Sequence, residues 1–142
     1  MAFVKIWVHA VWGTKNREPV LEKEILKPVC DHITENGKLK GIFIDCVNGY
    51  ADHLHCLMLL KADTSISKQM QLIKGESSFW INKNKIIKRR FEWADEYFAS
   101  SVSEDKLDIA KAYILSQQEH HKKVTFKDEY EKFLTHFGFH RG

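Results

Sequence analysis

The sequence predicts an α+β fold in which an antiparallel sheet has helices packed on one face. Runs rich in β-branched and aromatic residues alternate with runs whose apolar residues recur every three or four positions. The predicted order is strand, helix, strand, strand, helix, strand and then helices, and a tight-turn sequence joins the second strand to the third. This order is that of a ferredoxin-like or RRM-like (RNA-recognition-motif-like) sandwich, a fold that by itself identifies no function.

Size and composition indicate one domain over residues 1–142. The chain is 44% hydrophobic, and its 22 Lys and Arg residues against 19 Asp and Glu give a net charge of +3, too small to argue for or against a nucleic-acid partner. The three cysteines lie in apolar patterns without Cys-x-x-Cys spacing, which is typical of reduced core residues in a cytoplasmic protein. No stretch has the length of a bilayer span, so we expect no membrane association.

The first strand is expected over residues 3–12, where His9 interrupts an apolar run. This histidine is either an ordinary hydrogen-bonded residue or a neighbour of a metal site. The polar turn that follows exposes Lys15 and Arg17, which are either solvated or bind phosphate.

The first helix is predicted from apolar residues at every fourth position between Leu21 and Ile33, and it should end near residues 36–37. Pro28 either kinks this helix or begins its regular part. The second strand is expected over residues 42–47, and Asn48-Gly49 should turn it back against a third strand.

That third strand carries His53 and His55, followed by an apolar run to Leu60. Because side chains alternate along a strand, both imidazoles point to the same face, while Leu54 and Cys56 point to the other. Two imidazoles so placed can share a small cation, although a lone pair of this kind is more often two ordinary polar-face histidines.

A second helix should begin with Ser65 or Ser67 as its cap. Its apolar stripe is predicted to consist of Ile66, Met70, Ile73 and Phe79. Gly75 lowers the stability of this helix by up to about 1 kcal/mol relative to alanine, so either the sheet or a nucleic acid comes close there or the cost is simply tolerated.

The densest cationic stretch follows this helix and is interleaved with aromatic residues. Cations for phosphates and flat rings for bases are what a groove for single-stranded nucleic acid needs, but a solvated loop beside core aromatics is an equal alternative. A strand pair or one bent strand is expected next over residues 91–102, with Ser103 as a helix cap. The residues of the cationic stretch are Lys83, Lys85, Lys88, Arg89 and Arg90, flanked by Trp80, Phe91 and Trp93.

A third helix should carry Tyr113 and Gln117 one turn apart on the same face. The phenol and the amide oxygen can serve as a nucleophile and a ligand of a hard cation, or they can be structural. The cations after Gln117, His120 and His121 among them, suit the end of a helix dipole. A final helix is expected over residues 126–136, capped by Thr125.

Taken together, these segments resemble the HUH single-tyrosine transposases, the IS-two-hundred/IS-six-hundred-and-five-like family that includes the REP-associated tyrosine transposases. The match covers nearly the whole chain, with Ala51 standing where the family usually has proline. The segments that carry it are His53-Leu54-His55 for the His-hydrophobe-His motif, Thr14-Lys15-Asn16-Arg17 for the first turn, Lys74-Gly75-Glu76-Ser77 for the second helix, Tyr113-Ile114 with Gln117 for the nucleophile helix, and residues 119–130 for the segment after it.

The resemblance implies a transposase that cleaves and rejoins single-stranded DNA with hairpin ends through a 5′-phosphotyrosine on Tyr113. His53, His55 and Gln117 would hold a divalent metal, and this neutral donor set favours Mg²⁺ or Mn²⁺ over structural zinc. It also implies a homodimer in which the Tyr113 helix of one subunit completes the histidine pair of the other. The candidate DNA-binding residues are Lys15, Arg17, Lys74, Lys85, Lys88, Arg89 and Arg90.

Three alternatives remain open on the sequence. A domesticated single-strand nuclease or hairpin processor would use the same chemistry without a mobile element. A non-catalytic RRM-like nucleic-acid-binding module would stack bases on sheet aromatics. A metal-dependent hydrolase would use water, with Tyr113 structural. No residue stands out as the general base.

Overall fold

The fold is built on a four-stranded antiparallel sheet. The computed structural model describes residues 2–140, so Met1, Arg141 and Gly142, at the ends of the predicted domain, lie outside the described residues. The strand order is β2-β3-β1-β4, and every pair of neighbours is antiparallel, which confirms the predicted α+β class. The strands are β1 (Trp7–Thr14), β2 (Ile44–Tyr50), β3 (His53–Leu59) and β4 (Trp93–Val102).

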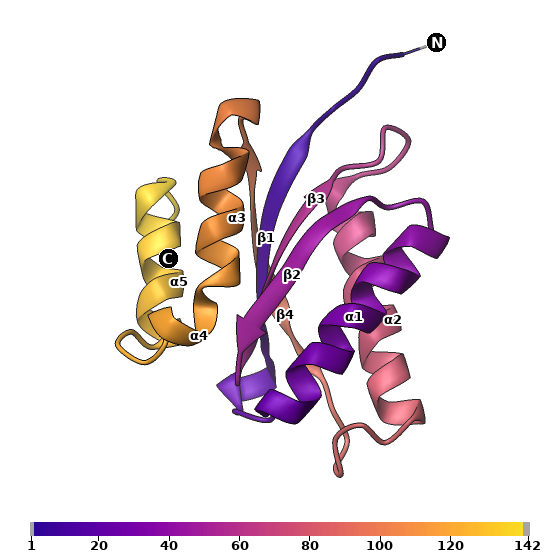
Figure 1. The fold of residues 1–142 in the computed structure, drawn as a ribbon, viewed down its shortest axis with the longest axis vertical. Helices are drawn as coiled ribbons and strands as arrows, with labels where there is room; N and C mark the ends of the chain where they lie inside the picture. The colour runs from indigo at the N-terminus through magenta and orange to yellow at the C-terminus, as the bar shows by residue number, and fades with distance from the viewer. Residues whose placement is uncertain (1, 141–142) are drawn as a thin grey trace.

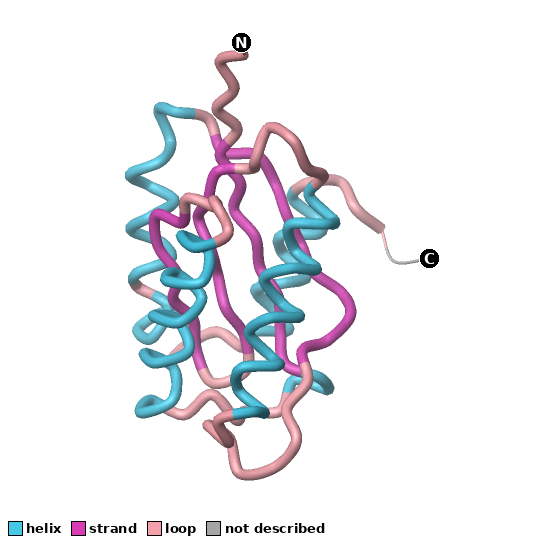
Figure 2. The backbone as a smooth tube through the Cα atoms, turned by 90° about the vertical axis from the view of Figure 1, so that its right-hand side faces the viewer, coloured by secondary structure: helices cyan, strands magenta, loops and turns pink. Residues whose placement is uncertain are grey.

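Helices flank this sheet. The helical layer predicted from the sequence consists of α1 (Lys23–Leu39) and α2 (Ile66–Lys83), which lie side by side (Figure 1). The C-terminal helices α3 (Leu107–Leu115), α4 (Gln117–His120) and α5 (Phe126–His136) form a second layer against the other side of the sheet (Figures 1 and 2). Short 3₁₀ turns, Lys15–Arg17 and Glu104–Lys106, follow β1 and precede α3. Within residues 2–140, no helix combines the length and apolarity needed to cross a bilayer.

The main apolar core lies between the sheet and the α1/α2 layer, because strand side chains alternate between the two faces. Trp12, Leu54 and Met58 are fully buried there. The first helix begins at Lys23, five residues before Pro28, so the alternative start at the proline is wrong. The sequence also placed β1 too early, since residues 2–6 are not part of the strand.

The turn between β2 and β3 differs from the prediction. The sequence predicted a turn at Asn48-Gly49, but Asn48 pairs with His55 and Gly49 with Leu54 inside the ladder, and the turn is Ala51-Asp52. A Cβ on Gly49 would collide with the His53 carbonyl and lie 2.9 Å from the Leu54 Cα. This glycine therefore permits a close approach of the neighbouring strand, and His53 directly follows the real turn.

Four predictions about the helix ends and strands had different outcomes. The Ser65 cap of α2 is confirmed, since its hydroxyl accepts from the Lys68 amide at 3.2 Å, and the Thr125 cap of α5 is confirmed in the same way. The predicted Ser103 cap is wrong, because its hydroxyl donates to the Asp105 carboxylate instead of capping a backbone amide. Residues 93–102 form one strand, β4.

The buried stripe of α2 is also shifted from the predicted one. Phe79 is 63% exposed, so its assignment to the core is wrong. The stripe passes instead through Ser77, whose hydroxyl accepts from the Trp93 indole N–H at 2.9 Å, and then through Ile81. A small polar residue occupies the core position because the large indole opposite it needs a hydrogen-bond acceptor.

Candidate metal and tyrosine site

Histidines gather on the face of the sheet that the C-terminal helices cover. His53 and His55 share that face, as alternation predicts, and both are fully buried. His9 on β1 joins them: its Nε2 lies 2.8 Å from Nδ1 of His55. Of the two readings of His9, the structure therefore supports the place beside the predicted metal site, where His9 fixes the orientation of the His55 ring and leaves Nε2 of His55 facing the site.

His53 is held on three sides. Its Nδ1 lies 2.9 Å from the Asp52 carboxylate, its Nε2 lies 2.9 Å from Oε1 of Gln117, and the Phe126 ring stacks on it at 4.1 Å between centroids. The turn at residues 51–52 thus supplies a carboxylate that orients the imidazole, an arrangement common behind metal-binding histidines.

Glu129 of α5 lies at the centre of the cluster and was not predicted. It is only 3% exposed. Its Oε1 is 3.1 Å from Nε2 of His55 and 3.4 Å from Nε2 of His53, and the Tyr113 hydroxyl donates to its Oε2. The signal in the sequence was an acidic residue inside the apolar stripe that Phe126, Tyr130 and Phe133 form along the last helix.

Tyr113 and Gln117 reach this cluster from two successive helices. The expected single helix ends at Leu115, and α4 begins at Gln117 after a break at Ser116. Gln117 is fully buried and also donates to Glu129 at 3.2 Å, whereas Tyr113 is partly buried with its ring centroid 5.6 Å from that of His55. The two side chains converge despite the break because both helices lie against β2 and both side chains reach Glu129.

The histidines after α4 do more than complement a helix dipole. His121 lies with Nδ1 2.6 Å from the Val124 carbonyl and Nε2 3.1 Å from Glu129, and His120 lies with Nε2 3.2 Å from the same carboxylate. The turn before α5 is thereby tied to the site, which the sequence interpretation had assigned to simple charge–dipole stabilisation.

Burial and neighbouring groups shift the pKa values of the three histidines in different directions. Burial, reinforced by the neighbouring His55, lowers the pKa of His9 to about 3, and burial lowers that of His55 to about 4. Burial acts in the same sense on His53, but hydrogen bonds with Asp52, Glu129 and Gln117 outweigh it and raise its pKa to about 9. The pKa values of His9 and His55 are therefore shifted in the opposite direction to that of His53.

The carboxylate and the phenol shift in opposite directions. Although burial opposes ionisation of Glu129, hydrogen bonds from His121, His53 and His55 hold its pKa well below the usual range. Burial and the adjacent Glu129 charge raise the pKa of Tyr113 well above 10. The phenol is thus a poor nucleophile until positive charge enters the cluster.

The donor atoms have the spacing that a small cation requires. An octahedral Mg²⁺ with bonds near 2.1 Å places adjacent ligands about 3.0 Å apart. The oxygen of Gln117, the Nε2 atoms of both histidines and Oε1 of Glu129 are separated by 2.9, 3.1 and 3.4 Å in adjacent pairs. His53, His55 and Glu129 form one group able to hold a metal ion, and the residues present fit such an ion.

Several predicted DNA-binding cations are already engaged within the chain. Lys15 pairs with Glu92 at 2.9 Å, Arg89 pairs with Glu18, and the Lys74 ammonium donates to the Ala94 and Asp95 carbonyls at 2.7 and 3.0 Å. In the part of the chain that the structure describes, no ion pair involves the others: Arg17, Lys85, Lys88 and Arg90.

The chain matches a known protein family over most of its length. The family described as "Transposase IS200 like" matches residues 2–117. The chain belongs to this family. No curated protein matches this IS200-like transposase. The match ends at Gln117, so Glu129 and the rest of α5 lie beyond it.

Several solved structures resemble this transposase, among them the following two. One is a protein of Deinococcus radiodurans R1 provisionally assigned as a transposase, with 22% identity and a TM-score of 0.65 over 82% of this chain and 93% of that one. The other is a REP-associated tyrosine transposase bound to a REP hairpin, with 16% identity and a TM-score of 0.63 over 87% of this chain and 73% of that one. At these identities the likeness shows the shared fold.

Proposed function

We propose that this IS200-like transposase cleaves and rejoins single-stranded DNA through a 5′-phosphotyrosine on Tyr113, with Mg²⁺ or Mn²⁺ held by His53, His55, Gln117 and Glu129. The observation that supports it best is the convergence of a phenol, two imidazoles, an amide oxygen and a carboxylate from β3, α3, α4 and α5 in one buried cluster. We also expect it to act in the cytoplasm, on DNA that carries hairpins.

In the proposed reaction the Tyr113 oxygen attacks the phosphorus, and the bond to the 3′ oxygen breaks. The 3′ oxygen leaves with a proton, and the phosphate stays esterified to tyrosine. A later 3′-hydroxyl reverses these bond changes and joins a new strand. One phosphodiester bond is exchanged for another at each step, so no external energy source is needed.

The phenol of Tyr113 must lose its proton to attack, and the residues of the site can assist that ionisation. At pH 7 a free phenol is ionised in about one molecule in a thousand, and burial here makes ionisation harder still. When bound, a divalent cation stabilises the negative charge of the transition state by several kcal/mol. Glu129 faces the histidines with Oε1 and accepts a hydrogen bond from the Tyr113 hydroxyl at Oε2, so it is our candidate for the group that receives the phenolic proton.

A hairpin-bearing substrate and a homodimer belong to the same proposal. Whether the protomers share their sites, as the family resemblance implies, is tested separately. Tyr113 lies beside the histidine pair of its own chain, an arrangement that supports cleavage in cis. A shared site requires exchange of α3 and α4 between protomers. Mixing a Tyr113→Phe variant with a His53→Ala variant tests this, because cutting returns in the mixture only if sites are shared.

The RRM-like module and the water-using hydrolase are weaker alternatives. A module of that kind stacks bases on an open sheet face, whereas here helices lie on both faces (Figure 1). The hydrolase would leave Tyr113 without a role. The domesticated nuclease shares the proposed chemistry, and hairpin ends beside the gene distinguish it from a mobile element.

The test is covalent capture. The protein is incubated with Mg²⁺ or Mn²⁺ and labelled hairpin-bearing single strands, and a denaturation-resistant protein–DNA adduct is expected. Tyr113→Phe should lose the adduct and keep binding, while Tyr50→Phe, at the end of β2, serves as the matched control and should keep both. Cutting by Tyr113→Phe would favour the hydrolase, and binding without cutting by the wild type would favour the module.

A further inference from the structure

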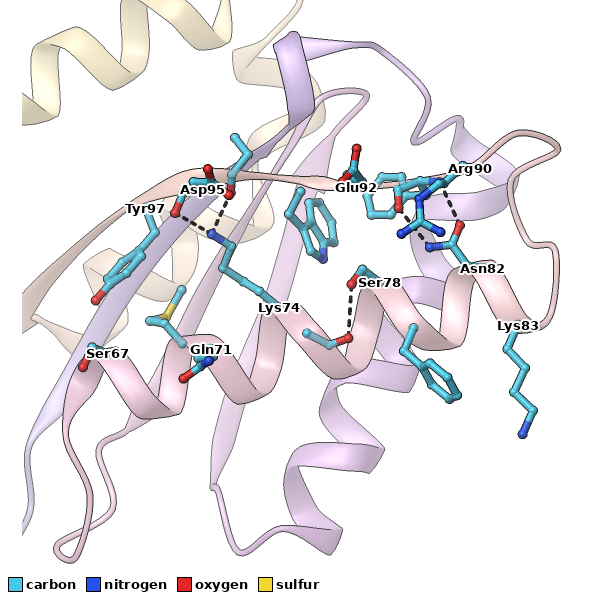
Figure 3. Close-up of a pocket in the computed structure, with 16 residues that line it drawn as sticks. Ser67, Gln71, Lys74, Ser78, Asn82, Lys83, Arg90, Glu92, Asp95 and Tyr97 are labelled. Atoms are coloured by element: carbon cyan, nitrogen blue, oxygen red, sulfur yellow. Dashed lines mark hydrogen bonds between the residues drawn. The ribbon is translucent and has the colours of Figure 1, made fainter.

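A hollow of about 880 Å³ opens between α2 and the outer edge of β4, away from the histidine cluster (Figure 3). Figure 3 shows Lys74 reaching from α2 to the strand, with Tyr97 near one end of the hollow and Asn82 and Arg90 near the other. The Asn82 amide both donates to the Phe91 carbonyl at 2.9 Å and accepts from the Phe91 amide at 2.8 Å. These contacts tie α2 to the segment before β4 at that end of the hollow.

Gly75 leaves the backbone of α2 bare at the wall of this hollow. It lies in the middle of α2 and lines the hollow, yet a Cβ added there would meet nothing within 4 Å. Packing against the sheet therefore does not explain the glycine, although glycine lowers helix stability relative to alanine. A bare backbone at an open wall allows another molecule to approach closely.

The chemistry of the wall favours an anionic, aromatic ligand. Three cations line the hollow, Lys74, Lys83 and Arg90, against the carboxylates of Glu92 and Asp95, and the Glu92 carboxylate is paired with Lys15. Four aromatic residues line it as well. Phe91 and Trp93 are buried, whereas Tyr97 is partly exposed and Phe79 is 63% exposed, far more than a core residue. Cations with exposed rings are what a single strand of nucleic acid binds.

Two smaller hollows continue this one toward the histidine cluster. Arg90, Phe91 and Glu92 also line a hollow of about 240 Å³ beside the β1 turn, and Thr14 and Asn16 are shared between that hollow and a third of about 330 Å³. The third is bordered by Gly13, which pairs with His53, and by Phe126, whose ring stacks on His53. The three together form a tract around the end of the sheet.

We propose that this tract binds the single-stranded nucleotides that adjoin the cleaved phosphate, with Phe79 stacking on a base, Arg90 contacting a phosphate and the backbone at Gly75 closely approached by the strand. The inference rests on the proposed function, because it places the unpaired flank of the same hairpin substrate. Lys74 holds the edge of β4 in place and shapes the wall of the tract.

The test measures binding without cutting, in a Tyr113→Phe background. Fluorescence anisotropy compares a hairpin that carries a single-stranded DNA flank with the same hairpin made blunt. Phe79→Ala should weaken binding of the flanked hairpin roughly tenfold and leave the blunt hairpin unchanged. Phe43→Ala is the matched control and should change neither, because Phe43 is 55% exposed and precedes β2, the opposite edge strand of the sheet.

Gly75→Ala gives the sharpest readout, because stability and binding should move in opposite directions. The added methyl group favours the helix and raises the Tm, yet it should weaken binding of the flanked hairpin severalfold. Leu72→Ala, on the same helix outside the hollow, should leave binding unchanged.

Three outcomes overturn the inference. They are equal binding of flanked and blunt hairpins, full affinity in Gly75→Ala and Phe79→Ala, and tighter binding of an RNA flank than of the DNA flank. If the wild type forms the covalent adduct while any of these holds, the inference fails and the proposed function stands. If no adduct forms but flank binding depends on Gly75 and Phe79, the tract stands as a binding site and the proposed chemistry fails.

Discussion

The two faces of the sheet are made by the same strands but differ in composition: one is the apolar core face and the other carries the buried histidines. On one face Trp12, Leu54 and Met58 pack against α1 and α2 in the main apolar core. On the other, His9, His53 and His55 lie under α3, α4 and α5, where the buried apolar cluster among the described residues consists of Val11, Phe98, Phe126 and Tyr130. One face supplies most of the stability, which allows the other to bury polar groups that cost stability.

Alternation makes this division strict. In β3 each residue of the histidine face is followed by one of the core face, so a slip of one position would exchange imidazoles for Leu54 and Cys56. The adjacent pairing of β2 with β3, where Gly49 allows the close approach, fixes that register.

The largest effect is expected from removing divalent metal. A chelator should reduce adduct formation by about a thousandfold or more, since metal stabilises the transition state by several kcal/mol. The fold should persist because its main core is on the other face, with only the ligand-linked part of stability lost, about 2.7 kcal/mol at a hundredfold excess over Kd. Adduct gels and thermal unfolding with and without added Mn²⁺ measure both. Undiminished cutting in chelator would contradict the metal site.

Truncating a side chain on the core face should lower stability and leave cutting intact, the opposite of removing the metal. Leu54→Ala should lower the free energy of unfolding by about 2–5 kcal/mol, because it leaves a cavity among fully buried side chains. Adduct formation per folded molecule should be retained at low temperature. Leu57→Ala, a buried leucine that belongs to neither apolar cluster, should cost less. Urea unfolding curves of the two variants test the contrast, and equal losses would refute it.

Acidification should destabilise the histidine face. The pKa values of His9 and His55 are lowered from 6.5 to about 3 and 4, so the unfolded chain binds protons first as the pH falls below 6.5. Each contributes a loss of about 2 kcal/mol by pH 5. His53 acts oppositely: its pKa is raised to about 9, so its contribution is present below pH 6.5 and fades as the pH rises through 9. The free energy of unfolding, measured from pH 5 to 9, should be highest between about pH 6.5 and 9, close to the lower of these values. In the His9→Gln variant it should fall less steeply below pH 6.5.

The smallest expected effect is on stability, where alanine substitutions at Gly75 and Gly49 should act in opposite directions. Gly75→Ala should raise the free energy of unfolding by up to about 1 kcal/mol, since alanine favours the helix and the space is open. Gly49→Ala should lower it by more than that, because the methyl group collides with the neighbouring strand. Chemical denaturation of both variants checks the signs. A stabilised Gly49→Ala would show that the β2–β3 approach is looser than described.

Much of the fold was predictable because it depends on local patterns. The order of strands and helices followed from periodicity, and the caps at Ser65 and Thr125 followed from short-range chemistry. The turn after β2 was missed because Asn48-Gly49 has the sequence of a turn, while the steric demand of Leu54 across the ladder decides its conformation. Phe79 was misassigned because an exposed ring on α2 has no local signature.

The amino-acid sequence alone determined the alternation that puts His53 and His55 on one face, and the residue types of Tyr113 and Gln117. Only the tertiary structure decided that these groups meet Glu129, His9 and His121, which lie on other strands, helices and turns. The physical reason is that spacing along one element fixes direction, whereas the distance between two elements depends on how their apolar faces pack. Glu129 is drawn into the site by the burial of Phe126 and Tyr130 beside it, and no pattern within α5 specifies which imidazoles it will meet.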